Sequence, residues 1–221
     1  MSTNYKYPRT YHFPFSEGLT TDDRKVDSDW WKFFEGRELV LTEKLDGQCN
    51  CIKSNGVYAR SHSTPTMHPW DKYFTEPGGI YDFAKYMLAD DEAIYGESLY
   101  AIHSIEYQKL PSYFHVFAAR NDNGWYSWSD VCEMAEMCNL PTVPVLERNI
   151  FDSPEELEKS ILNHMKHGSA YGDTIEGIVV RVADDFPIDE FSHNVVKYVR
   201  KNHVQTDIHW TKNWKKAELI R

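Results

Sequence analysis

The chain has 221 residues, of which 41% are hydrophobic and 14% are aromatic, and its formal net charge is −10. This is enough apolar material to fill a sizeable core, so we expect the chain to fold without a partner. No stretch approaches the roughly 20 apolar residues of a membrane-spanning helix, and the N-terminus has no apolar signal core. These features argue against a membrane-spanning protein and favour a cytoplasmic location.

Charge is distributed unevenly along the chain. Residues 194–221 contain seven Lys or Arg against two acidic residues, a local balance of +5, which leaves −15 for the remainder. A nucleic acid is usually met by a basic surface, so the overall charge argues against such a partner. A basic C-terminal segment on an acidic body nevertheless suits a protein that binds phosphates locally. A solvated helix with ordinary lysines is an equally good interpretation of this segment.

Hydrophobic periodicity and turn residues predict a mixed α and β domain. In chain order, the expected elements are a strand at 37–46, a hairpin at 49–61, a helix at 80–90, strands at 93–100 and 113–119, helices at 130–138 and 154–167, strands at 175–183 and 193–200, and a helix at about 205–219. No repeat or linker divides the sequence. We therefore expect one domain over residues 1–221, with 1–36 as an N-terminal extension and 202–221 as a basic C-terminal helix.

Turn and cap residues set several of these boundaries. Asn55-Gly56 is the strongest short signal for the turn of a hairpin. Ser129 is the expected N-cap of the helix that follows it. Ser153, with Pro154 and Glu156 behind it, is a capping-box start with proline at the first helical position. The four cysteines lack the Cys-x-x-Cys spacing of a zinc site and are expected to be free thiols: Cys49, Cys51, Cys132 and Cys138.

The run LVLTEKLDG, residues 39–47, places Lys44 at the end of a β-rich segment with Asp46 and Gly47 behind it. A lysine amine can attack a phosphorus atom only when it is neutral, which requires desolvation or a nearby positive charge to lower its pKa. Glycine lets the chain turn with no Cβ in the way of a ligand. Alone the pattern is weak, because a strand that ends in an ordinary Asp-Gly turn has the same residues.

Further short motifs follow Lys44 in a definite order. They are Arg60 in YARSH, Glu97 in YGES, Phe114 and Phe117 in FHVF, Glu176 in EGIVVR, and Lys197 in VVKYVR. The series resembles the nucleotidyltransferase motifs of the covalent lysyl-adenylate superfamily, which includes ATP-dependent RNA ligases, DNA ligases and mRNA capping enzymes. The small size of the chain makes it most similar to the RNA ligase family. The motifs cover residues 43–200, which is most of the chain.

The resemblance implies an α+β fold, namely a nucleotidyltransferase (adenylation) domain of mainly antiparallel sheets flanked by helices. The C-terminal β-barrel domain of DNA ligases and capping enzymes is not expected in this chain. The resemblance also implies that Lys44 attacks the α-phosphate of ATP, releases pyrophosphate and holds AMP as a phosphoramide. The strongly negative triphosphate calls for Mg2+ or Mn2+ as well as cationic side chains.

Three charged residues have roles that follow from the resemblance. Lys197 would contact the α-phosphate, and its charge would lower the pKa of Lys44. Glu97 would accept hydrogen bonds from the ribose hydroxyls. Glu176 would act in metal binding and phosphoryl transfer, since a carboxylate oxygen suits a hard cation. Taken singly, each of these residues could also be an ordinary residue of a strand or strand end.

The remaining motif residues are expected to contact the nucleotide or the nucleic acid. Phe117, in preference to Phe114, would stack on the base. Arg60 would meet the nucleotide or the 5′-phosphate of the nucleic acid, because its guanidinium fork fits a phosphate. Glu43 would lie near the adenine. Asp46 belongs to the lysine motif and would act in a later step, contact the nucleic acid or shape the turn.

The chain departs from the family pattern at its last motif. That motif usually carries two lysines separated by one residue, whereas Val199 stands at the second position here. Arg200 is a candidate for the missing cation, and Arg200 and Lys201 are candidate phosphate or nucleic-acid contacts. Only 24 residues follow Lys197, so docking of a polynucleotide is expected to use the basic tail or an accessory protein or domain.

The leading interpretation is an ATP-dependent polynucleotide ligase, most similar to RNA ligases, which joins 5′-phosphate and 3′-hydroxyl ends of RNA through lysyl-AMP. The alternatives are another nucleotidyltransferase, such as a DNA nick-sealing ligase or a capping guanylyltransferase, and a non-catalytic module that binds nucleotide or RNA. The preference for RNA over DNA depends on contacts to 2′-hydroxyls, which none of these motifs reports.

Overall fold

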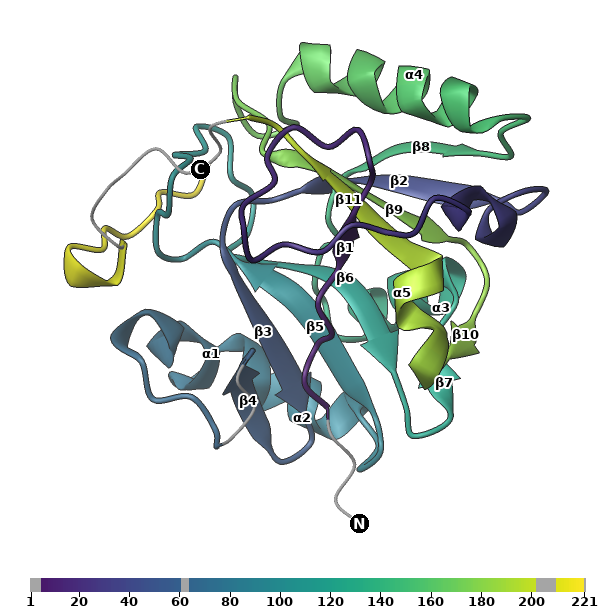
Figure 1. Ribbon diagram of the computed structural model, residues 1–221. Helices are drawn as coiled ribbons and strands as arrows, with labels where there is room; N and C mark the ends of the chain where they lie inside the picture. Colours follow the sequence, from purple (N-terminus) through teal and green to yellow (C-terminus); the bar gives the residue numbers. More distant parts are fainter. Residues whose placement is uncertain (1–4, 61–63, 202–209, 221) are drawn as a thin grey trace.

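The computed structural model describes residues 5–60, 64–201 and 210–220, and it contains two β-sheets that lie against each other (Figure 1). One sheet has the strand order β1-β11-β9-β2-β8, and the other has the order β10-β7-β6-β5-β3-β4. Among the described strands, neighbours are antiparallel except β1 and β11, which run parallel. The expected class, an α+β domain of mainly antiparallel sheets with flanking helices, is confirmed.

The strands are short, as the sequence patterns predict. The first sheet consists of β1 (Tyr11–His12), β2 (Leu39–Lys44), β8 (Val145–Asn149), β9 (Gly177–Val182) and β11 (Val195–Val199). The second sheet consists of β3 (Gln48–Lys53), β4 (Gly56–Ala59), β5 (Ala93–Ser98), β6 (Phe114–Arg120), β7 (Gly124–Trp125) and β10 (Phe186–Pro187).

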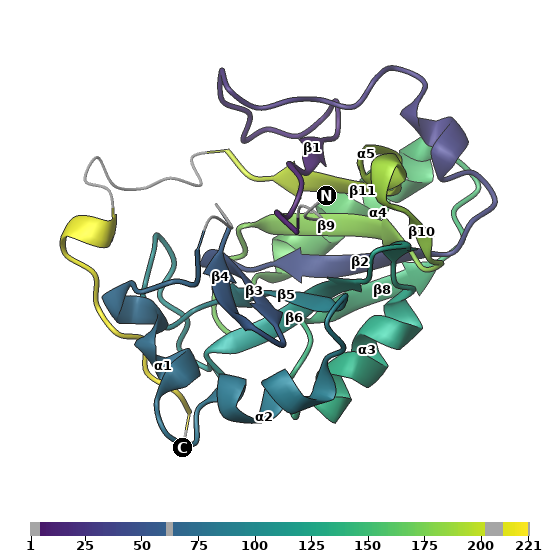
Figure 2. The same cartoon turned by 90° about the horizontal axis from the view of Figure 1, so that it is seen from below.

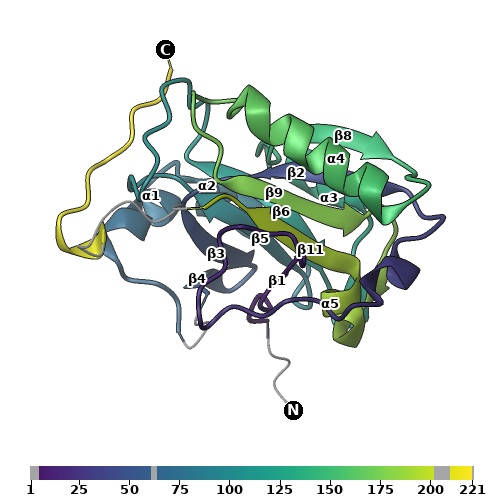
Figure 3. The same cartoon turned by 45° about the horizontal axis from the view of Figure 1, so that its top comes forward.

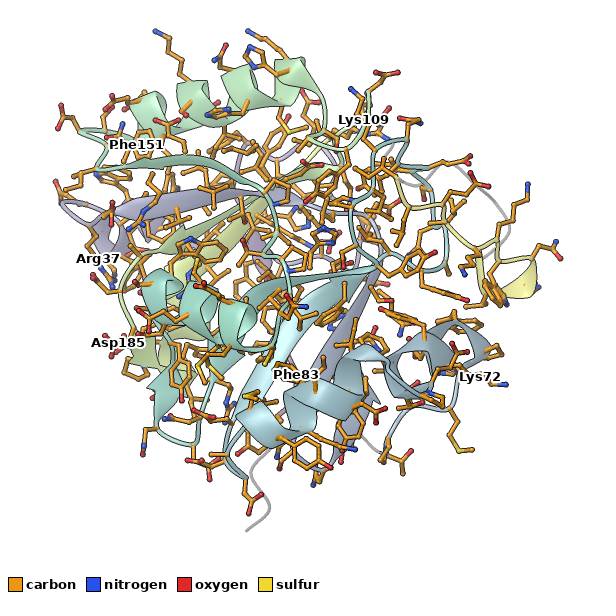
Figure 4. All side chains as sticks on the ribbon, turned by 180° about the vertical axis from the view of Figure 1, so that it is seen from behind. Arg37, Lys72, Phe83, Lys109, Phe151 and Asp185 are labelled. Atoms are coloured by element: carbon orange, nitrogen blue, oxygen red, sulfur yellow. The ribbon has the colours of Figure 1, made fainter. Side chains whose placement is uncertain are left out.

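Helices cover the outer sides of the two sheets (Figures 2 and 3). They are α1 (Lys72–Thr75), α2 (Ile80–Met87), α3 (Trp128–Met137), α4 (Pro154–His164) and α5 (Phe191–Asn194). α2 packs on β3, α3 packs on β6, and α4 lies along β8. Seen from behind, Phe83 lies on the outward side of α2 (Figure 4). None of the helices within the described residues is long and apolar enough to cross a membrane.

Short 3-10 turns complete the described secondary structure. They are Trp30–Phe33, Pro69–Asp71, Met165–His167, Ile188–Glu190 and Trp210–Lys212. All four cysteines are free, as expected.

The core fills the space between the sheets and beneath α4. Leu39 and Leu41 of β2 are fully buried in one apolar cluster, and Leu157 and Ile161 of α4 belong to the same cluster. Val40, between the two leucines, is buried in the second cluster instead. Burying each such side chain contributes roughly 1.5 to 3 kcal/mol before the loss of chain entropy is counted. Both faces of β2 are therefore fixed, which holds the end of this strand in place.

Most of the predicted elements are confirmed with boundaries shifted by a few residues. The hairpin turns between β3 and β4 at Ser54 and Asn55. The hydroxyl of Ser153 accepts a hydrogen bond from Glu156 N and caps α4, which ends at His164 and continues as a 3-10 turn.

One predicted helix cap is wrong. Ser127, not Ser129, caps α3, because its hydroxyl accepts a hydrogen bond from Asp130 N at 3.1 Å. The helix therefore starts at Trp128, whose indole is buried under it.

The prediction of a helix at about 205–219 is also wrong for residues 210–219, which the structure describes. Trp210–Lys212 forms a single 3-10 turn, and residues 213–220 are not helical. The backbone of this tail bonds to another part of the protein instead: Ala217 N donates to Tyr100 O at 2.8 Å, and Ile220 N donates to Leu110 O at 2.9 Å. The first part of the predicted helix, 202–209, lies outside the described residues.

Candidate active site

A cavity of about 390 Å³ opens between the two sheets. Its walls come from β2, β3, β5 and β6, from β9 and β11, and from the N-terminal segment. The charged and polar side chains that line it are Arg9, Thr10, Asp22, Asp23, Thr42, Glu43, Lys44, Cys49, Arg60, Glu97, Arg181 and Lys197. The apolar lining includes Tyr7, Phe117, Trp125, Val143, Val179, Phe186, Phe191 and Val195. The cavity thus has a charged part and an apolar, largely aromatic part.

Lys44 stands at the end of β2, where it pairs in register with Gly177 of β9. This pairing places Glu176, the residue before β9, beside the lysine, and Glu176 Oε2 lies 2.6 Å from Lys44 Nζ. The Lys44 side chain is 26% exposed and that of Glu176 only 7%. The strand register therefore creates a half-buried ion pair next to the cavity.

This ion pair decides the charge of Lys44. Burial acts to lower the pKa of the Lys44 amine, but the carboxylates of Glu176, Glu97 and Asp46 outweigh it and raise the pKa above its ordinary value. The expected lowering by Lys197 stays a prediction, because the net shift of the Lys44 pKa is set by the carboxylates. Burial, followed by the charge of Lys44, lowers the pKa of Lys197 to about 8.

Gly47 allows the chain to turn tightly behind Lys44. A Cβ at this position would lie 2.4 Å from the backbone oxygen of Ser98 and 2.7 Å from a side-chain carbon of Leu99. The amide of Gly47 donates to Glu97 Oε1 at 3.1 Å, which orients this carboxylate toward the cavity. Burial raises the pKa of Glu97 to about 8, although the charge of Lys44 opposes the shift.

Two further cations of the sequence motifs, Arg60 and Lys197, share the cavity with Lys44. Lys197 enters from β11 and is 18% exposed, with Asp23 Oδ1 3.8 Å from its amine. Arg60 follows β4 directly and is exposed at the edge of the cavity. The structure therefore brings Lys44, Arg60 and Lys197 together, where they can meet a chain of phosphates.

The two phenylalanines of the FHVF motif have different surroundings. Phe117 lines the cavity and is only partly buried. Phe114 has no exposed surface and packs against Phe74, with ring centroids 5.1 Å apart. Phe117 is therefore the one available to a ligand, and Val179 lines the same cavity from the opposite sheet.

Glu43 is buried beside the cavity. Its Oε2 accepts a hydrogen bond from Ala170 N at 2.9 Å, and the Ser169 side chain also interacts with the carboxyl. Oε1 is buried and has no partner in hydrogen-bonding geometry among the described residues. Burial raises the pKa of this carboxyl. An unpaired buried oxygen is costly, so it marks a place where a ligand donor would be stabilised.

The other predicted contacts lie apart from the cavity lining. Asp46 Oδ2 accepts from Ser104 N and Ile105 N, both at 2.7 Å, so the carboxylate holds a neighbouring loop and shapes the turn. Arg200 N donates to the carbonyl oxygen of Glu176, and Lys201 is exposed beyond it.

Sequence reasoning missed the N-terminal wall of the cavity. Tyr7, Asp22 and Asp23 all line it, although no motif marks residues 1–36. Tyr7 packs edge-on against Phe117, with ring centroids 5.0 Å apart. These residues reach the cavity through the parallel pairing of β1 with β11, a contact between distant parts of the sequence that no local pattern reveals.

A comparison of the sequence with models of protein families identifies the family of the chain. The sequence model of the RNA ligase family matches residues 37–199, and the chain belongs to this family. The matched range contains every motif residue from Glu43 to Lys197. A comparison with curated protein sequences gives no match.

Solved structures share the fold at low sequence identity. The chain is similar to an RNA ligase from Naegleria gruberi, solved with pyrophosphate, with a TM-score of 0.58 and 16% identity over 90% of this chain and 62% of that one. It is similar to an archaeal ATP-dependent RNA ligase, with a TM-score of 0.53 and 15% identity over 86% and 48% of the two chains. A protein from Aquifex aeolicus described as an ATP-dependent DNA ligase gives a TM-score of 0.55 and 20% identity over 88% and 49%. The chain thus spans about half to two thirds of their length.

Proposed function

We propose that the chain is an ATP-dependent RNA ligase that joins 5′-phosphate and 3′-hydroxyl ends through a lysyl-AMP intermediate. The observation that carries this proposal is the Lys44–Glu176 ion pair beside a cavity that also contains Lys197 and Arg60. Transfer of AMP to lysine requires a nucleophilic amine, groups that stabilise phosphate charge and a recess for the base. The RNA ligases from Naegleria gruberi and archaea share this fold, and a variant of the Naegleria enzyme was solved with ATP and manganese.

Lys44 is the proposed nucleophile. Its nitrogen would bond to the α-phosphorus of ATP while the bond from that phosphorus to the bridging oxygen breaks and pyrophosphate leaves. Since the attacking amine must be neutral, the proton that Glu176 and Glu97 hold on Lys44 has to be released first. The side chain is 26% exposed, which gives this proton a route to water.

Glu176 is the proposed protein ligand of Mg2+ or Mn2+. Mg2+ usually binds one or two carboxylates together with substrate phosphates. No group of three potential metal-binding side chains occurs among the residues described, so protein ligands alone would leave the coordination incomplete. The cation, when bound, would supply positive charge that offsets the triphosphate and the carboxylates around Lys44.

The nucleoside would lie in the apolar part of the cavity. Phe117 is proposed to stack on the adenine with Val179 on the other wall, and Glu97 is proposed to accept hydrogen bonds from the ribose. The unpartnered Oε1 of Glu43 suits the amino group of adenine, whereas guanine presents a carbonyl acceptor at the same edge. This difference favours ATP over GTP.

The acceptor of the AMP is proposed to be a 5′-phosphate of RNA, since the chain belongs to the RNA ligase family. Arg60, exposed at the cavity edge, is the proposed contact for this phosphate. Attack by a 3′-hydroxyl on the adenylylated end then releases AMP and joins the strands. Arg200, Lys201 and the basic tail are proposed contacts of the polynucleotide backbone.

Strand joining tests this proposal. The protein is incubated with ATP, Mg2+ and a labelled RNA that carries a 5′-phosphate and a 3′-hydroxyl, as a nick in a duplex and as a single strand. We expect a joined product that requires the 5′-phosphate and disappears in Lys44→Ala. Lys53→Ala, which alters a lysine at the end of β3 in the other sheet, should still join ends. Failure to join any of these ends would contradict an RNA ligase.

Sealing of DNA is the second candidate, because the fold is also similar to that of the Aquifex protein described as a DNA ligase. The same joining assay with nicked DNA duplexes of the same sequence separates an RNA ligase from a DNA ligase. Efficient joining of DNA and none of RNA would favour this candidate.

A further inference from the structure

The N-terminal segment, residues 5–26, lies outside the range that the RNA ligase family model matches, yet it forms one wall of the cavity. Figure 1 shows this segment in purple, crossing β11. β1 pairs with β11 so that His12 lies beside Lys197, and Phe13 N donates to Lys197 O at 2.9 Å. The segment is therefore fastened directly to the residue that we propose as the α-phosphate contact.

The same segment folds back and brings Asp23 to this place. His12 N donates to Arg24 O at 2.8 Å, and Val26 N donates to His12 O at 3.0 Å, which sets residues 24–26 alongside β1. Asp23 Oδ1 then lies 3.8 Å from Lys197 Nζ and 3.3 Å from His12 Nε2. A carboxylate thus faces the lysine amine inside the cavity.

The orientation of this carboxylate is set within the segment. Asp23 Oδ2 accepts hydrogen bonds from Thr20 N at 3.1 Å and from Thr20 Oγ1 at 2.9 Å, which leaves Oδ1 directed toward Lys197 and His12. Asp23 and Lys197 both line the cavity, and their side chains are 21% and 18% exposed. The contact is neither a surface ion pair nor a fully buried one, so it is open to an incoming anion.

We propose that Asp23 occupies the phosphate-binding place at Lys197 and that a nucleotide phosphate must displace it in order to bind. The inference rests on the proposed function, because it takes Lys197 as a phosphate contact. A carboxylate and a phosphate are both anionic acceptors for the same ammonium group, so they compete for it, and at close range they repel each other. Asp23 is a positioning residue that acts through Lys197. It holds the lysine amine in the cavity and weakens nucleotide binding.

Replacement of Asp23 by asparagine tests this inference, with Asp22→Asn as the matched control. Asp22 is the neighbouring residue, lines the same cavity and loses the same charge, but within the described residues it forms no ion pair with Lys197. Calorimetry measures the binding of α,β-methylene ATP with Mg2+, a nucleotide that cannot transfer AMP. We expect the Kd to fall at least threefold in Asp23→Asn, to change less than twofold in Asp22→Asn, and to stay near the wild-type value in Asp23→Glu.

Two results would overturn the inference. Weaker or unchanged binding in Asp23→Asn would mean that Asp23 supports the nucleotide, for example through its metal ion. Equal tightening in both asparagine variants would mean that only the overall charge of the cavity matters. Thermal unfolding of each variant checks that the fold is intact.

The ATP dependence of lysyl-AMP formation gives a second readout. We expect a lower KM for ATP in Asp23→Asn with an unchanged maximal rate, whereas a merely structural residue would change the rate and the unfolding temperature instead. The calorimetric test needs no AMP transfer. If the wild-type protein formed no lysyl-AMP, the proposed function would fail while the binding comparison would still decide the role of Asp23.

Discussion

Glu176 Oε2 lies 2.6 Å from Lys44 Nζ, although 132 positions separate the two residues in the sequence. Lys44 ends β2, and Glu176 precedes the neighbouring strand β9. The pair exists because Lys44 and Gly177 are partners in the β2–β9 register, with Glu176 one residue outside the strand. A shift of one residue would turn the lysine away from the cavity. The apolar residues that fix β2 on both faces therefore also fix the proposed nucleophile.

Phe117→Ala and Phe114→Ala are expected to separate ligand binding from stability. Loss of Phe117 removes the proposed stacking on adenine, worth roughly 1 to 3 kcal/mol, so the KM for ATP should rise about fivefold or more. Loss of Phe114 leaves a cavity in the core and should cost about 3 to 5 kcal/mol of unfolding free energy. Denaturant unfolding and ATP titration of lysyl-AMP formation measure both effects. The reverse outcome, with Phe114 controlling KM, would contradict the proposed site.

Three residues of the central part of this site stand at or next to the end of a strand. Lys44, Glu97 and Glu176 were assigned from their resemblance to the family motifs. The β2–β9 pairing places Glu176 beside Lys44, and the amide of Gly47 links Glu97 to the same turn. Phe117 was preferred to Phe114 from the sequence, but spacing alone does not show that Phe114 is fully buried while Phe117 lines the cavity. Their environment became clear only from the packing.

Gly47→Ala should disturb the turn behind Lys44. The added methyl group would meet the backbone oxygen of Ser98, which cannot rotate away, so we expect a loss of about 1 to 3 kcal/mol of stability and at least a tenfold loss of AMP transfer. Gly36→Ala is the control, because a Cβ there has no neighbour within 4 Å, and its positive φ alone should cost about 1 kcal/mol. Thermal unfolding and a single-turnover assay test the pair. Full activity of Gly47→Ala would show that the close approach to Ser98 does not matter.

Ser127→Ala should destabilise α3, whereas Ser129→Ala should not. The Ser127 hydroxyl accepts the hydrogen bond from Asp130 N, and removal of an N-cap typically costs about 1 kcal/mol. Ser129 lies in the first turn, so its replacement should stay within about 0.5 kcal/mol. Urea unfolding of the two variants measures the difference. A larger loss for Ser129→Ala would place the helix start where the sequence alone suggested.

The chain termini were the least predictable parts. The tail after residue 210 has the charges of a helix end, but its amides bond to the loop around Tyr100 and Leu110. Residues 5–26 carry no motif, but they add β1 to the first sheet and bring Asp23 to Lys197. In both cases hydrogen bonds between distant segments determine the structure, and local propensity does not report them.

His115 should make stability depend on pH. Burial lowers the pKa of His115 to about 4, compared with about 6.5 in an unfolded chain. The neutral imidazole contributes fully to the stability above pH 6.5, and this contribution is lost as the pH falls toward 4. Each unit by which the pKa is lowered corresponds to about 1.4 kcal/mol of unfolding free energy. His115→Leu removes the titration, and both ring nitrogens lack hydrogen-bond partners in the described residues. Urea unfolding measures the free energy of unfolding at pH 7.5 and at pH 4.5. This free energy should fall by about 2 to 3 kcal/mol more in the wild type than in His115→Leu. Parallel pH profiles would contradict a buried neutral imidazole.

The measurement that tests the account most directly is the site of covalent AMP after incubation with ATP and Mg2+. Peptide mass spectrometry on the denatured protein locates the modified lysine, with Lys44→Ala as the control. We predict AMP on the peptide that contains Lys44 and none in the variant. AMP on another lysine, or no covalent nucleotide with ATP, GTP or NAD and either Mg2+ or Mn2+, would contradict the assignment of Lys44 as the nucleophile.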